Sequence, residues 1–133
     1  MKALAAGLVA CALLMACGAS QESQDKLRET VVRFNEGVRW GRLQDVMPYV
    51  YAENSAHFLE MHKAFGKDIQ VSDYEIITVT LDSEKKKADV NVQISWYRLS
   101  QMVSYTTILV QHWEKQKQDW IMIAEEFRSG EPF

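Results

Sequence analysis

The stretch ADVNVQISWY, residues 88–97, decides the fold of this chain. Apolar and polar residues alternate along it, the two sets being Ala88, Val90, Val92, Ile94, Trp96 and Asp89, Asn91, Gln93, Ser95, Tyr97. A period of two residues predicts a β-strand with one buried and one solvent-facing side, which is typical of an antiparallel sheet. We therefore expect the apolar set to face a core.

Three further segments have the composition of strands, at residues 74–81, 103–113 and 120–126. They are rich in β-branched and aromatic residues, and short turns separate the four segments, at 82–86, 100–102 and 114–119. Consecutive strands joined by short turns predict an antiparallel meander.

Before residue 66 the apolar residues follow a helical period. Leu27, Val31, Phe34 and Val38 recur at i, i+4, i+7 and i+11, which predicts one helix with a single apolar face, capped by Ser23 or Asp25. A short helix near residues 43–50, which contains Pro48, and a third helix at about 53–65 should follow. Helices followed by strands predict an α+β domain, with the helices on the apolar face of a curved sheet.

The order of these elements resembles the NTF2-like superfamily, whose fold is an α+β cone. The stretches that carry the resemblance are ISWYRL (94–99), YTTILVQHW (105–113) and QDWIMI (118–123). In small NTF2-like domains a strand ending in Tyr-Arg is followed by one ending in Gln-x-Trp and then by a Trp-x-Ile strand. The resemblance implies a four-stranded cone, but no particular function, because this fold carries enzymes, binding proteins and inert scaffolds.

The first sixteen residues do not share the pattern of the domain. Lys2 is the only charged residue before Glu22, and residues 3–16 are all apolar or small. A bilayer needs about 20 apolar residues, so this run is too short to span one. Its positive start, apolar middle and small end are typical of a secretory signal peptide.

The end of this run, Leu14-Met15-Ala16-Cys17, resembles the bacterial lipobox. The resemblance implies that the chain is cut before Cys17, that the Cys17 thiol receives a diacylglyceryl group, and that a fatty acid such as palmitate is added to the new amino group. Two or three acyl chains would hold the protein firmly at a membrane, since each methylene group buried in the bilayer contributes about 0.8 kcal/mol. The alternative is ordinary cleavage after Ala19, which would release a soluble periplasmic accessory protein.

We expect four parts in the chain: a lipoprotein signal peptide at 1–16, an acylated cysteine and tether at 17–25, an NTF2-like domain at 26–127 and a tail at 128–133. Cleavage removes Cys11 and leaves Cys17 as the only cysteine, so no intrachain disulfide is expected. Gly18 rather than an acidic residue follows Cys17, which implies an outer-membrane anchor in the cell envelope, facing the periplasm.

Composition disfavours some partners. The formal net charge is −3 and no basic patch stands out, so nucleic-acid binding is not expected. No cofactor is expected either. His57 and His62 lie five residues apart, about 140° around a helix, and cannot chelate one metal together.

Few residues can carry chemistry. His62 falls on the apolar stripe of the third helix, and Trp96 lies on the inward face of the strand 88–97. Glu125 and Glu126 are adjacent on the last strand, so one of them must point inward. We take His62, Trp96 and Glu126 as candidate ligand-binding residues. An inward glutamate would be a general acid or base with a raised pKa, or would pair with an arginine such as Arg98.

No catalytic residue is assigned from the sequence, because the inward face of residues 88–97 has no acid, base or nucleophile. His112 is expected to pair across strands at the surface. We expect a non-catalytic envelope lipoprotein that binds a small apolar ligand or a protein partner. NTF2-like domains often dimerise through their outward sheet face, so the resemblance implies, as an alternative to another protein partner, a homodimer through the polar face with Asn91, Gln93 and Tyr97. The rival is an enzyme of isomerase or dehydratase type with His62 or Glu126 as base.

Overall fold

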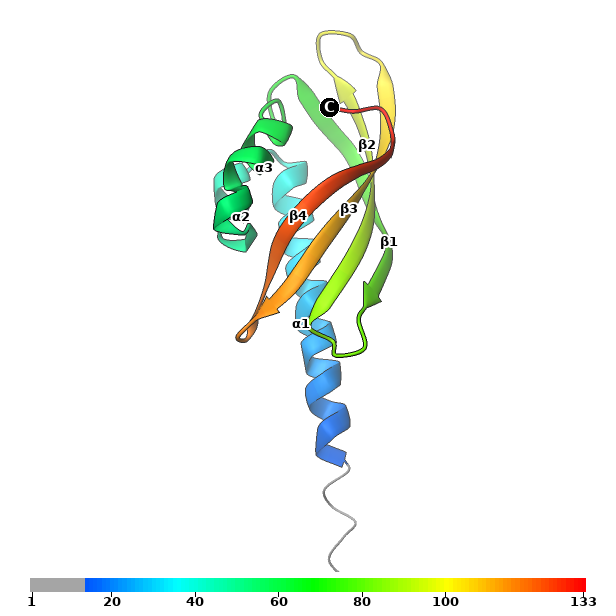
Figure 1. The fold of residues 1–133 in the computed structure, drawn as a ribbon. Helices are drawn as coiled ribbons and strands as arrows, with labels where there is room; N and C mark the ends of the chain where they lie inside the picture. Colours follow the sequence, from blue (N-terminus) through cyan, green and yellow to red (C-terminus); the bar gives the residue numbers. More distant parts are fainter. Residues whose placement is uncertain (1–13) are drawn as a thin grey trace, which may run out of the picture.

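The structure, a computed structural model, describes residues 14–133, with side chains from residue 21 onward. Within this range the elements are α1 (Leu14–Arg39), α2 (Leu43–Val46), the 3-10 turns η1 (Met47–Tyr49) and η2 (Ala52–Asn54), α3 (Ser55–His62), β1 (Ile69–Leu81), β2 (Lys87–Arg98), β3 (Ser104–Gln116) and β4 (Asp119–Gly130). The strands form one open antiparallel sheet in the order β1-β2-β3-β4, with the helices on one side (Figure 1). The predicted α+β fold is confirmed, and it is consistent with an NTF2-like cone.

The predicted inward face of β2 is the centre of the core. Its side chains are all buried, namely Ala88, Val90, Val92, Ile94 and Trp96. Cross-strand partners share a face, so the pairing of Val92 with Leu109 and of Ala88 with Trp113 carries the apolar face onto β3. The polar residues of β2 therefore point away from the helices, as expected.

Helix α1 crosses the open face of this sheet. Its predicted apolar stripe is buried, the residues being Leu27, Val31, Phe34 and Val38. Where α1 first meets the sheet, Trp120 Nε1 donates to the carbonyl of Ser23 at 3.3 Å. Near the other end, Arg39 Nη2 donates to the carbonyl of Ser72 at 3.0 Å. The helix thus runs from the β3–β4 turn to the edge strand β1.

Two glycines fix the approach of α1 to the α3–β1 connection. Gly41 and Gly66 have φ angles of 68° and 73°, in the left-handed region. A Cβ atom on Gly41 would lie 2.6 Å from the Cα atom of Gly66, closer than real contacts allow. Side chains at these positions would therefore push α1 away from the end of α3.

The N-terminal part of the chain differs from expectation. α1 begins at Leu14, so residues 17–25 are helical rather than an irregular tether, and Ser23 and Asp25 lie inside the helix instead of capping it. Nine helical residues reach about 12–14 Å, against roughly 30 Å when extended. Residues 1–13 of the expected signal peptide lie outside the described range. None of the described helices is long and apolar enough to cross a membrane.

Three other boundaries differ. β1 begins at Ile69 instead of residue 74, because a bulge after Val71 breaks the alternation that would have marked its start. α3 ends at His62, and Pro48 lies in the first turn of η1. β4 continues to Gly130, so the first half of the expected tail at 128–133 is strand.

Candidate functional site

Aromatic side chains fill the space between the helices and the sheet. The Phe34 ring lies 5.3 Å from that of Trp113, edge to face, and 5.6 Å from that of Phe58. All three side chains are 1% exposed or less, as is Met122 beside them. The middle of the cone is therefore a packed core.

One acid–base pair lies within this core. His62 Nε2 is 2.5 Å from Glu125 Oε1, and the two side chains are 0% and 3% exposed. α3 supplies the histidine from its last turn, and β4 supplies the carboxylate from the facing strand. The sequence offered no such dyad, because the two residues meet only when the helix folds onto the sheet.

Two amides extend the pair into a buried polar network. Gln111 Nε2 donates to Glu125 Oε2 at 2.8 Å and to Asn35 Oδ1 at 2.8 Å. Asn35 Nδ2 in turn donates to the Val31 carbonyl at 2.8 Å. Both oxygens of Glu125 thus accept hydrogen bonds, which offsets the cost of burying a carboxylate.

The surroundings of the second ring nitrogen of His62 indicate which of its two nitrogens carries the hydrogen. His62 Nδ1 is buried and has no hydrogen-bond partner among the described residues. A buried N–H without an acceptor is costly. We therefore assign the ring N–H to Nε2, which donates to Glu125 Oε1, and leave Nδ1 as an acceptor. In this state His62 positions Glu125, and its own ring is fully buried.

A β-bulge decides which glutamate is inward. Trp120 and Met122 face the core, and continued alternation would bring Glu126 inward. The register shifts between His112 and Trp113 of β3, where Met122 and Ala124 are their partners, so β4 has an extra residue at Ile123. One extra residue exchanges the two faces of a strand. The candidate Glu126 therefore does not lie with His62 and Trp96, and the inward position, which the sequence left open between two glutamates, belongs to Glu125.

Glu126 lies instead on the outer face of the sheet, with His112. His112 Nδ1 is 2.7 Å from Asp89 Oδ1, and its Nε2 is 3.5 Å from Glu126 Oε2. Partial burial of the ring disfavours its protonation, but the hydrogen bonds and charges of Asp89 and Glu126 outweigh this and raise the pKa of His112 above 6.5. The predicted cross-strand surface pairing of His112 is confirmed.

Trp96 lies at the same end of the core as His62. Its side chain is 1% exposed, and its indole Nε1 donates to Thr107 Oγ1 at 2.8 Å. The ring of Phe133 covers this end, with its centroid 5.4 Å from the Trp96 ring and 5.8 Å from the His62 ring. The residues after β4 are thus part of the domain, and they close the end of the cone above His62.

The backbone holds this closing segment in place. Thr107 Oγ1 donates to the carbonyl of Glu131, and the Glu131 N–H donates to the Thr106 carbonyl at 3.3 Å. Gly130 turns the chain with a φ of 90°, and a Cβ atom there would collide with the Thr106 carbonyl oxygen at 2.2 Å. Phe133 is therefore positioned by the backbone hydrogen bonds of Glu131, two residues before it, and by the contacts of its own ring.

Arg98 is not the partner of the inward glutamate. Its Nη1 lies 3.3 Å from Asp68 Oδ2, and Asp68 also accepts bonds from the backbone N–H and the hydroxyl of Ser100. The Ser100 hydrogen bonds, with a contribution from Arg98, lower the pKa of Asp68. Arg98 thus fastens the β2–β3 turn to the start of β1.

A surface groove lies outside the core, between α1 and β1. Its volume is about 410 Å³, and its walls are Val31 and Val32 of α1 and residues 76–79 of β1, with Arg28 at one end. No group of three or more metal-ligating side chains occurs among the described residues. Cys17 lies in the first turns of α1, in a part whose side chains are not described.

Comparison with known proteins adds no further constraint. No protein-family model matches the chain, and no curated protein sequence is significantly similar to it. The function must therefore be inferred from the chain's own residues.

Proposed function

We propose that this protein is a bacterial envelope lipoprotein, anchored through Cys17, whose NTF2-like domain binds a protein partner and has no catalytic role. The observation that carries the proposal is the placement of apolar side chains. The inside of the domain is filled by its own aromatic residues, whereas four of the eight large apolar residues that are exposed in the described chain lie along α1 and the neighbouring strand β1; the other four are Leu99, Met102, Val103 and Phe127.

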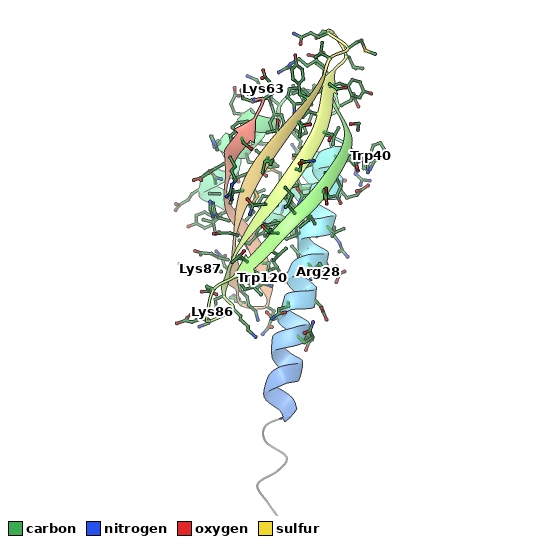
Figure 2. The ribbon with its side chains drawn as sticks, turned by 90° about the vertical axis from the view of Figure 1, so that its right-hand side faces the viewer. Arg28, Trp40, Lys63, Lys86, Lys87 and Trp120 are labelled. Carbon is green, nitrogen blue, oxygen red and sulfur yellow. The ribbon has the colours of Figure 1, made fainter. Side chains whose placement is uncertain are left out.

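Four of these exposed residues belong to that side of the molecule. Trp40 is 59% exposed, Val32 and Ile77 are each 44% exposed, and Val79 is 38% exposed. The hydrogen bond from Tyr74 Oη to the Val32 carbonyl brings this part of α1 against β1. Figure 2 shows Trp40 and Arg28 along this side. Tryptophan and arginine are the residue types that most often dominate binding between proteins.

The anchor is supported by the sequence and by the form of α1. The lipobox resemblance at residues 14–17 implies acylation of Cys17, and the helix is continuous from Leu14 into the domain. An anchored Cys17 would therefore be joined to the sheet by a helix rather than by a loose linker. Such a helix would hold the domain close to the membrane surface with its α1–β1 side open to a partner in the same envelope.

Site-specific crosslinking in intact cells tests the proposal. A photoreactive benzoylphenylalanine in place of Trp40 should give one defined crosslinked product in the membrane fraction. The same group in place of Glu84, at the exposed β1–β2 turn, is the control and should give none. Absence of any product from position 40, together with recovery of the protein from the soluble fraction, would contradict the proposal.

The buried pair His62–Glu125 favours a second candidate, an enzyme of isomerase or dehydratase type. A carboxylate held by a histidine in an apolar site can act as a general base. Substrate would reach it only after Phe133 has moved. Deuterium exchange next to the carbonyl of cyclohexenone is a direct assay, since the enzyme would catalyse exchange and the Glu125→Gln variant would not. No exchange above the uncatalysed rate would exclude this candidate for that substrate class.

A further inference from the structure

The groove between α1 and β1 is bordered by a free sheet edge. The strand order leaves β1 and β4 at the edges of the sheet. The β4 edge is engaged where the Tyr51 N–H donates to the Met122 carbonyl at 2.9 Å. The start of β1 is engaged by Gly66 at Ile69 and by Arg39 at Ser72. Within the described chain, the backbone of residues 73–81 pairs with β2 alone.

The groove walls are apolar and reach the surface. Val31 forms the floor and is fully buried, whereas Val32, Ile77 and Val79 are between 38% and 44% exposed. A bulge at Ile77 interrupts the ladder, and regular pairing resumes from Thr78 to Leu81. The accessible regular edge is therefore short, with apolar side chains at its side.

Arg28 adds a charge at one end of the groove. It lines the groove, and no acid of the described chain is paired with it. Arg39 contacts Ser72 and Val32 contacts Tyr74, so α1 and β1 run in opposite directions. Arg28 consequently lies beside the later part of β1, where a carboxylate on an added segment would meet its guanidinium group.

We propose that this groove binds an extended peptide segment of the partner, which adds to the edge of β1 as a further strand. The segment carries apolar side chains at alternate positions, facing Val32, Ile77 and Val79, and a carboxylate opposite Arg28. Main-chain hydrogen bonds to residues 78–81 give affinity, and the alternate side chains give specificity. A hydrocarbon chain would leave the donors and acceptors of the strand edge unused. The inference rests on the proposed function and names the class of segment that is bound.

A synthetic peptide tests this inference directly. The probe is a capped hexapeptide, Glu-Thr-Val-Thr-Val-Thr, and the control peptide has lysine in place of glutamate. The probe should slow hydrogen exchange of the amides of residues 78–81, and it should bind at least tenfold more tightly than the control. Ile77→Lys should weaken binding at least tenfold, whereas Leu99→Lys, a change at a similarly exposed apolar residue outside the groove, should stay within twofold. Arg28→Glu should reverse the preference between the two peptides.

Several outcomes would overturn it. The first is slower amide hydrogen exchange on β4 instead of β1 when the probe is added. The second is binding of the probe by the Ile77→Lys variant as tight as by the unmodified sequence. The third is a dimer of the protein that the probe dissociates, since the edge of β1 would then pair with a second copy. Photoreactive groups at three positions separate this inference from the proposed function.

A crosslinked product from Met102 in the exposed β2–β3 turn, with none from position 40 or 77, would support a protein partner but reject the groove as its binding site. No product from any of the three positions would reject both.

Discussion

His62 Nε2 and Glu125 Oε1 lie 2.5 Å apart in the buried core, although 63 residues separate them in the chain. The contact joins the last turn of α3 to the middle of β4, and Gln111 and Asn35 continue it to α1. It therefore ties four elements together, namely α1, α3, β3 and β4, through polar groups that are buried. A network of this kind is costly to break, because each partner left behind is a buried polar group without a bond.

Removal of the carboxylate should destabilise the fold strongly. We expect Glu125→Ala to lower the free energy of unfolding by about 3–5 kcal/mol, since it leaves His62 and Gln111 without their acceptor. The matched control is Glu126→Ala, which removes the adjacent but exposed carboxylate and should cost about 1 kcal/mol or less. Urea denaturation of the purified variants measures both. Equal losses for the two variants would mean that the inward and outward assignments are wrong.

Loss of the Phe133 ring should expose His62. Phe133 covers the end of the core, with ring contacts to His62, Phe65 and Trp96. In Phe133→Ala, modification of His62 by diethyl pyrocarbonate should be at least tenfold faster than in the unmodified sequence, as read by peptide mass. His57, which is exposed in both proteins, is the internal reference. An unchanged rate at His62 would show that another group shields it.

Stability should depend on pH through His112. Its pKa is raised in the folded protein, so its ion pairs contribute fully below about pH 6.5 and the contribution is lost as pH rises through the higher folded value. His112→Gln should therefore lower the free energy of unfolding more at pH 6 than at pH 9. The difference should be about 0.2–1 kcal/mol, as for other partly exposed pairs. Repeating the measurement in an Asp89→Asn background should reduce it, and a larger loss at pH 9 would reverse the assigned direction.

The contact between Gly41 and Gly66 should tolerate no side chain. Gly41→Ala combines a positive φ with a Cβ atom 2.6 Å from the Gly66 backbone, and we expect a loss of roughly 2 kcal/mol or more in the free energy of unfolding. Gln44→Ala, an exposed change three residues later, is the control and should stay within about 0.5 kcal/mol. Thermal unfolding compares the two. A neutral Gly41→Ala would mean that α1 and the α3–β1 connection are further apart.

Periodicity predicted the fold well because the core faces of α1 and β2 are regular. Leu27 to Val38 repeat every turn and Ala88 to Trp96 repeat every second residue, and each set is buried. The same reasoning could not decide between Glu125 and Glu126 on β4, because one extra residue at Ile123 reverses the two faces and brings Glu125 inward. Local patterns cannot show a bulge whose cause is the register of the neighbouring strand.

The candidate site was predicted in part. His62 and Trp96 are buried, as their positions in the apolar patterns indicated, but their placement at one end of the core is known only from the structure. Gln111 was missed, although it lies between Leu109 and Trp113 on the inward side of β3, where alternation alone would have found it. Its link to Asn35 spans 76 residues and depends on how α1 crosses the sheet, which no sequence period encodes.

Attachment to a membrane through Cys17 is the central claim of the proposed function, and the mass of the mature N-terminal peptide tests it most directly. We predict a peptide that begins at Cys17 and carries two or three acyl chains, and a Cys17→Ser variant that incorporates no labelled fatty acid and leaves the membrane fraction. A mature chain that begins at Ser20 without lipid, as cleavage after Ala19 would produce, would contradict the claim.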